Sequence, residues 1–178
     1  MKKTILLMAV AISSVAVFAQ KKTTTSGTIA FDATTTLDAL PKAENKTVIA
    51  AVDTKSGTIL FEALVKSFNF SNPMMQEHFN GPKWFDSDKD PKASFSGIIT
   101  NLKEVNFNKD GTYKSIVQGD LTLKGITNKV STVATFEVKG KSVTTNAVFN
   151  IKLVDYKISD AKGKVAEEPQ ITVTAVLN

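Results

Sequence analysis

The sequence predicts an all-β protein whose antiparallel strands form a sandwich or a barrel. Apolar and polar residues alternate with period two in several segments, which is typical of strands with one buried face. Turn signals containing glycine separate these segments. A single segment lacks the alternation and consists mostly of helix-tolerant residues. Many short strands with one helical insertion favour a sandwich or an antiparallel barrel.

The amino-terminal segment predicts export. Lys2 and Lys3 precede an apolar stretch over residues 5–18, and Val17-Phe18-Ala19 has the small-residue pattern of a signal-peptide cleavage site. We expect cleavage between Ala19 and Gln20, which leaves residues 20–178 as one domain in the periplasm or outside the cell. The alternative is a retained anchor, but the apolar stretch is short and two serines interrupt it.

The first half of the domain contains three candidate strands and the helix. After a polar lead-in over residues 20–26, alternation predicts strands at residues 28–33, 48–53 and 58–69. In the last of these, both faces carry large apolar residues, which indicates a bulge or burial on both sides. A short helix is expected near residues 72–80, because Asn72-Pro73 is a start signal and Asn80-Gly81-Pro82 a stop signal.

The second half is a succession of hairpins. Strands are expected at residues 93–101, 102–108, 112–123, 129–138, 143–153 and 171–177. Asp110-Gly111 and Gly140-Lys141 have the composition of tight hairpin turns, and Gly125 ends the strand before it. The count of candidate strands is therefore about nine.

Composition excludes several classes of function. The 178 residues, 42% of them hydrophobic and 22% charged, match one ordinary globular domain. All 22 basic residues are lysines, so the side chain that reads phosphate and guanine in a bidentate manner is missing and no nucleic-acid partner is expected. The absence of cysteine excludes disulfides and thiolate metal sites. With one histidine, His78, we expect no metal and no cofactor, and an enzyme ranks last.

Three blocks of sequence resemble the YceI-like family: Met75-Gln76-Glu77-His78-Phe79-Asn80, Asp90-Pro91-Lys92-Ala93-Ser94-Phe95, and Gly119 to Thr127. They occur in the order found in the family. The resemblance implies an exported bacterial protein with an extended lipocalin-like antiparallel β-barrel of about eight strands. It also implies binding of an amphiphile such as a polyisoprenoid, without a reaction. The chain departs from the family around Asp155-Tyr156, which leaves the head group of the ligand open.

Alternation within a barrel predicts which side chains face the interior and line a ligand cavity. The candidates are Phe61, Val65, Phe68, Phe79, Leu121, Leu123, Phe136, Val138, Phe149, Ile151 and Leu153. The same residues would equally fill a core without ligand, as in a scaffold or adhesion sandwich. An integral outer-membrane barrel is disfavoured, because presumed outward positions carry lysine, glutamate and asparagine and the chain has one Trp and two Tyr. Association of two copies stays open.

Residues in and after the helix form a second group of candidates. We expect Glu77, His78 and Asn80 to hydrogen-bond across the helix and hold it over the barrel rim, in preference to a catalytic or metal role. Phe79, Trp84 and Phe85 would then act as a plug or a gate. Asp86, Asp88 and Asp90 predict a solvated acidic loop, because the glycine and glutamate of a calcium-binding loop are missing.

Overall fold

The computed structural model describes residues 20–39, 41–158 and 164–178, so the expected signal peptide over residues 1–19 lies outside the described residues. The strands in this part of the chain are β1 (Lys21–Asp32), β2 (Lys42–Asp53), β3 (Thr58–Leu64), β4 (Asn69–Phe70), β5 (Lys92–Ile99), β6 (Gly111–Leu123), β7 (Ile126–Lys139), β8 (Ser142–Asn150) and β9 (Gln170–Leu177). Helix α2 (Pro73–Asn80) and three 3-10 helices, η1 (Val65–Ser67), η2 (Leu102–Glu104) and η3 (Leu153–Tyr156), complete the fold. Among the described residues, no helix has the length and apolar character needed to cross a membrane.

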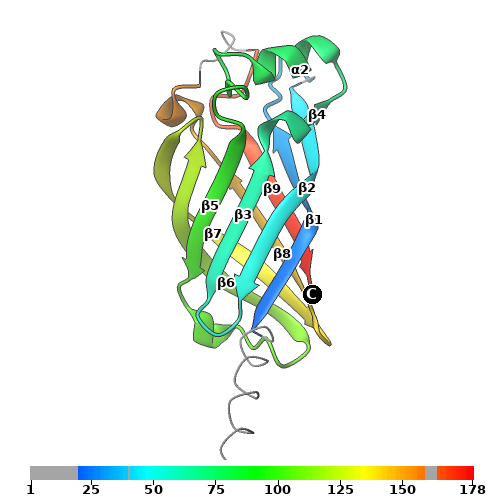
Figure 1. Ribbon diagram of the computed structural model, residues 1–178, viewed down its shortest axis with the longest axis vertical. Helices are drawn as coiled ribbons and strands as arrows, with labels where there is room; N and C mark the ends of the chain where they lie inside the picture. Colours follow the sequence, from blue (N-terminus) through cyan, green and yellow to red (C-terminus); the bar gives the residue numbers. More distant parts are fainter. Residues whose placement is uncertain (1–19, 40, 159–163) are drawn as a thin grey trace, which may run out of the picture.

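The strands close into a barrel. The order in the sheet is β1-β9-β8-β7-β6-β5-β3-β2-β4, and β1 also pairs with β2, so the eight long strands form a ring. Every strand pairing in the described part of the chain is antiparallel. Figure 1 shows an elongated barrel with α2 lying across one end. The predicted antiparallel barrel of about eight strands with one helical insertion is confirmed.

Strand β8 illustrates how alternation produces the barrel wall. Val143 and Thr145 are buried inside, whereas Asn146 and Val148 are exposed on the outer surface. The turn before β8 is tight because Gly140 adopts a φ of 59°, a left-handed conformation that favours glycine. This turn pairs Lys139 with Ser142 and fixes the register of the hairpin.

Two glycines allow β5 and β6 to approach closely. Gly97 is paired directly with Gly119. A Cβ atom on Gly119 would lie 2.3 Å from the carbonyl oxygen of Ser96 and 2.4 Å from the Cα of Gly97, which is closer than atoms can approach. The pairing of these two strands in their present position therefore requires glycine at residue 119.

The structure corrects three predictions. Residues 102–108 form η2 and turns instead of a strand, because Val105 and Phe107 are buried under the barrel end and their alternation does not reflect sheet pairing. Asp110-Gly111 therefore joins no hairpin; the Asp110 carboxylate accepts a hydrogen bond from the backbone N–H of Gly140 at 2.8 Å. The lead-in over residues 20–26 belongs mostly to β1, whose threonine-rich start pairs with β2.

Strand β3 resolves the ambiguous segment over residues 58–69. Ile59 and Ala63 are buried inside the barrel, while Leu60 and Leu64 are exposed on its outside. Pairing with β5 runs without a register shift from Thr58 to Leu64, after which the chain enters η1. The large apolar residues on the outer face are therefore exposed leucines, and the strand contains no bulge in its pairing with β5.

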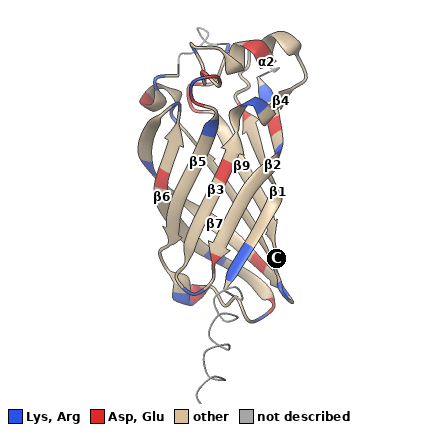
Figure 2. Cartoon of the chain, in the orientation of Figure 1, with Lys and Arg blue, Asp and Glu red and all other residues tan. Residues whose placement is uncertain are grey.

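Two apolar clusters fill the barrel ends. We call residues 71–90, which contain α2, the cap, and residues 100–110, which contain η2, the base. The cluster at the cap end includes Phe31, Phe68, Phe79 and Phe85, and the cluster at the base end includes Phe107 and Phe136. Most charged residues lie toward the two ends of the barrel, and its walls carry few of them (Figure 2). The space between the two clusters is where a ligand cavity is found.

Candidate ligand-binding cavity

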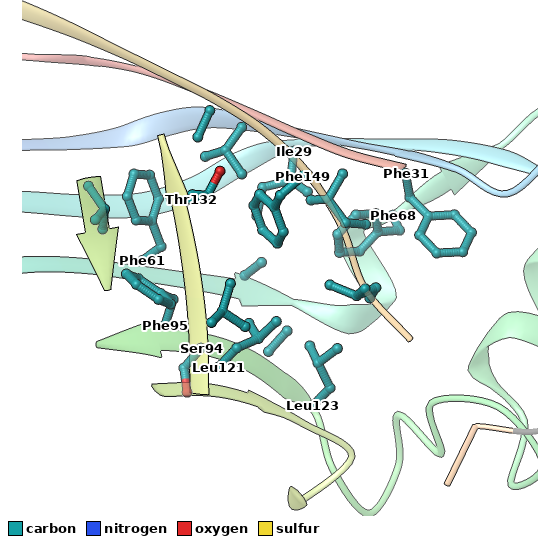
Figure 3. A pocket seen from close by; sticks show the side chains of 18 of the residues that line it. Ile29, Phe31, Phe61, Phe68, Ser94, Phe95, Leu121, Leu123, Thr132 and Phe149 are labelled. Atoms are coloured by element: carbon teal, nitrogen blue, oxygen red, sulfur yellow. The ribbon is translucent and has the colours of Figure 1, made fainter. Parts of the chain in front are cut away.

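An apolar cavity of about 120 Å³ lies inside the barrel between the two clusters. One row of its wall is made by Phe61 on β3, Phe95 on β5 and Leu121 on β6, which are paired directly across neighbouring strands. Figure 3 shows these three side chains pointing into the cavity. Among the described residues, the polar ones that line the cavity are Ser94, Thr132 and Thr145, and none of the lining residues is charged. Such a wall attracts hydrocarbon and offers little to a polar or charged group.

The structure places eight of the eleven candidate residues on the cavity wall. These are Phe61, Val65, Phe68, Phe79, Leu121, Leu123, Phe149 and Ile151. Phe136 and Val138 face the interior too, but they lie deeper toward the base, where the ring of Phe107 packs edge-on against Phe136 with centroids 5.9 Å apart. Leu153 lies beyond the end of β8, in η3, and packs into the cap-end cluster. Contact of any of these residues with a ligand stays a prediction.

The cap closes the barrel through a cluster of phenylalanine rings around Phe79. The ring centroid of Phe79 lies 4.4 Å from that of Phe85, 4.9 Å from Phe70, 5.6 Å from Phe68 and 5.8 Å from Phe31. Tilted and edge-on ring pairs of this kind each add to the apolar burial that holds the helix in place. Phe79 therefore joins the cap to the barrel wall and also forms the end of the cavity.

Polar contacts fix the ends of the cap. The side chain of Asn72 accepts a hydrogen bond from the N–H of Met74 at 2.9 Å, which starts α2 as the sequence predicts. Gln76 accepts from the N–H of Phe70 at 3.0 Å. On the far side, the ammonium group of Lys124 donates to the carbonyl oxygen of Pro82 at 2.8 Å and to that of Lys157 at 3.4 Å. Lys124 thus connects the cap to the turn between β6 and β7 and to the turn after η3.

A family model of the YceI-like domain matches residues 10–177. The chain belongs to the YceI-like family. No curated protein matches the chain. The fold of this YceI-like chain is similar to that of a polyisoprenoid-binding domain from Saccharophagus degradans, with a TM-score of 0.74 at 10% identity over 89% of this chain and 98% of the other.

Two further solved structures share the fold. BcnA from Burkholderia cenocepacia is 20% identical, with a TM-score of 0.55 over 90% of this chain and 97% of its own. A YCEI protein from Campylobacter jejuni is 17% identical, with a TM-score of 0.56 over 73% of this chain and 78% of its own. At these identities the likeness establishes the barrel architecture and leaves the ligand to be argued from the cavity.

Sequence reasoning missed several lining residues of the YceI-like barrel. They include Ile29, Phe31, Phe95, Val130 and Val173. A signal for Phe95 exists, because Ala93, Phe95, Gly97 and Ile99 share one face of a period-two segment. Val130 lies on the same face of β7 as Phe136, which is among the predicted lining residues. A signal for Ile29 and Phe31 also exists, because the alternation that predicts a strand at residues 28–33 places both on one face.

The titratable groups of the described part of the YceI-like barrel lie outside the cavity wall. Burial raises the pKa of the Asp32 carboxyl, but hydrogen bonds from Thr34 and contact with Lys42 outweigh burial and hold that pKa below its usual value. Burial raises the pKa of the Tyr156 hydroxyl above its usual value. A hydrogen bond with Asn128 lowers that pKa by less than burial raises it, and the nearby Asp155 charge adds a smaller increase. Within the described residues, no three or more histidine, aspartate or glutamate side chains come together as a metal site.

The side chain of His78 on α2 is the candidate for a catalytic or metal-binding role in the YceI-like protein. In the described part of the chain, its exposed side chain and that of Glu77 make no hydrogen bond or ion pair, so only Asn80 makes one of the expected contacts, donating to the carbonyl oxygen of Gln76 at 2.8 Å. We expect His78→Ala to change the Kd for the isoprenoid alcohol geranylgeraniol by less than about twofold, because surface changes are nearly neutral. Loss of binding, measured by equilibrium dialysis, would contradict this assignment.

Proposed function

We propose that this YceI-like protein is an exported binding protein that holds the chain of an amphiphilic lipid, foremost a polyisoprenoid, inside its barrel. The observation that carries the proposal is the closed barrel with an apolar, uncharged cavity lined by phenylalanine and branched aliphatic side chains. Each methylene group moved from water into such a lining contributes about 0.8 kcal/mol before the cost of ordering the chain. The structural relative from Saccharophagus degradans, described as polyisoprenoid-binding, also supports this ligand class.

The polar head of the ligand would lie outside the cavity. No charged residue lines the wall, and a buried head group without partners would lose its hydrogen bonds to water. Affinity would therefore come mainly from the chain, and several head groups would be tolerated. The proposed activity is binding without a reaction, with no cofactor, no nucleic acid and no stable insertion into a membrane.

The size of the cavity favours a second candidate function. A volume of about 120 Å³ is well below the roughly 300 Å³ or more of typical small-molecule sites. A barrel filled mostly by its own side chains would suit a scaffold or adhesion protein. For the binding function to hold, the barrel must widen when a long chain enters, which requires some part of its wall to move.

Native and denaturing mass spectrometry of the protein purified from the envelope of its host, without detergent, test the proposal. We expect the native mass to exceed the denatured mass by one prenyl or acyl lipid, and solvent extraction identifies that lipid. The denatured mass also reports cleavage after Ala19, and the native mass reports whether two copies associate. An empty protein that also fails to take up added geranylgeraniol would favour the filled scaffold.

A further inference from the structure

The ladder between β7 and β8 stops half-way up the barrel. Strand β7 is paired with β6 along its whole length, and β8 is paired with β9 up to Asn150. Between β7 and β8, however, pairing runs only from Lys139–Ser142 to Ala134–Ala147. Residues 126–133 of β7 therefore have no strand partner on the β8 side among the described residues. We call the space between residues 128–133 and residues 148–155 the slit.

The cavity lies directly behind the slit. Val130 and Thr132 of β7 line the cavity on one side of the slit, and Phe149 and Ile151 line it on the other. Figure 3 shows the side chains of Thr132 and Phe149 at the cavity. From Asn128 to Ala134 the edge of β7 is about 20 Å long at the usual rise per residue. An extended hydrocarbon chain lying along this edge would face the cavity over most of its length.

Three side-chain hydrogen bonds bridge the slit and its upper end, and one of them, between Asn128 and the Tyr156 hydroxyl, involves a buried residue. The Thr132 hydroxyl donates to the carbonyl oxygen of Val148 at a long 3.4 Å, and the Asn128 amide donates to that of Asp155 at 3.0 Å. Water can replace exposed hydrogen bonds at small cost. The two exposed contacts therefore resist opening much less than a continuous ladder would.

A second break in the ladder, between β2 and β3, is closed differently. Pairing there ends at Ile49–Glu62, but above that point Asn45, which is 0% exposed, donates to the carbonyl oxygen of Leu64 at 3.0 Å. The Asn45 side chain also accepts from the N–H of Thr47 at 2.9 Å. Opening this break would strip a buried amide of its partners. Of these two breaks in the ladder, the slit is therefore the one that separates more easily.

The outer borders of the slit are apolar. Val133 is 58% exposed on β7, Val148 is 52% exposed on β8, and Val154 is 75% exposed on η3. The lysines on both sides are held in ion pairs, Lys129 with Asp120 and Lys152 with Glu168. An apolar chain can therefore contact valine side chains on the surface before it reaches the cavity.

We propose that the slit between β7 and β8 is the port through which a lipid chain enters and leaves the cavity, while the cap stays closed. The inference rests on the proposed function. The cap is held by the buried ring cluster around Phe79 and by an exposed contact of Lys124, whereas the slit has no strand ladder and is bridged by the side chains of Thr132 and Asn128. Parting of β7 and β8 would also supply the widening that a long chain needs.

Cross-linking across the slit tests the port, because the chain has no native cysteine. Continuing the register of β7 and β8 places Ser131 opposite Asn150, and both side chains are exposed and absent from the cavity wall. We expect Ser131→Cys with Asn150→Cys, joined by bis-maleimidoethane, to take up geranylgeraniol at least tenfold more slowly than the same protein before cross-linking. Cross-linking after loading should slow release by a similar factor. Uptake and release are measured by mass spectrometry of solvent extracts.

A matched lock on the cap provides the control. Lys83→Cys with Lys124→Cys, cross-linked by the same reagent, replaces the Lys124 contact by a covalent link and should leave uptake within about twofold. Lys129→Cys with Lys152→Cys is a second slit lock if the first variant folds poorly. The port is overturned if slit-locked protein exchanges at the unlocked rate, or if the cap lock blocks uptake. If protein that is folded and not cross-linked binds no geranylgeraniol, the proposed function is wrong, and the proposed port is wrong for the same reason.

Discussion

Leu121→Asp is expected to abolish lipid uptake and to destabilise the barrel. Leu121 lies in the cavity wall between Phe95 on β5 and Asn128 on β7, and its side chain points into an apolar space (Figure 3). A carboxylate at this position would lie in an otherwise apolar wall and would repel a hydrocarbon chain. We expect the Kd for geranylgeraniol to rise by about 100-fold or more, since each 1.4 kcal/mol lost is a factor of ten. The free energy of unfolding should fall by about 3 kcal/mol, as for other losses of core packing.

Two control variants separate the effect of a buried charge from the effects of added charge and of lost packing. Gln118→Asp adds the same charge on the exposed outer face of β6 and should leave both the Kd and the free energy of unfolding nearly unchanged. Leu121→Ala removes the packing without adding charge, so it should destabilise the fold while retaining more binding than Leu121→Asp. Dialysis and urea unfolding measure the two quantities. Tight binding by a folded Leu121→Asp protein would show that the ligand lies elsewhere.

Gly119→Ala should lower the free energy of unfolding by about 3 kcal/mol, at the upper end of the usual cost of overpacking. The added methyl group would lie 2.3 Å from the carbonyl oxygen of Ser96, so β5 and β6 must move apart. This change would also displace Leu121, two residues along the same face, and weaken binding. Urea unfolding followed by the fluorescence of Trp84, the single tryptophan, gives the free energy.

Gly140→Ala is the matched control for this effect. A Cβ at Gly140 meets no atom within 4 Å, so the cost arises only from the left-handed φ of 59°. That cost should be about 1 kcal/mol. Equal losses of stability in the two variants would mean that close strand approach is not the reason for glycine at position 119.

Local signals in the sequence were sufficient for much of the fold. Alternation identified β8 because one face of the strand packs inside the barrel and the other faces water. The start of α2 was found because Asn72 caps the helix and Pro73 fits its first turn. Both signals depend on residues that are close in the sequence, so no knowledge of the tertiary structure is needed to interpret them.

Features that depend on distant parts of the chain were not predictable. Alternation assigns Phe136 to the inner face of β7, but it does not say how deep along the barrel the residue lies. Val105 and Phe107 alternate with exposed residues because the loop of the base packs both side chains under the barrel end. This pattern resembles that of a strand although the loop pairs with none. The slit leaves no trace in the sequence of β7, since it reflects where β8 departs toward η3.

Closure of the barrel places the start of β1 next to the carboxyl-terminal residue of the chain. Thr23 and Asn178 exchange backbone hydrogen bonds of 3.1 and 3.2 Å, and both lie at the base end, opposite α2 (Figure 1). A linker that attaches a surface directly before Gln20 or after Asn178 would therefore hold the barrel with α2 at the end farthest from that surface. With either attachment point, the side wall formed by β7 and β8 would face the surrounding solution. Immobilised protein therefore remains suitable for measuring lipid uptake and release.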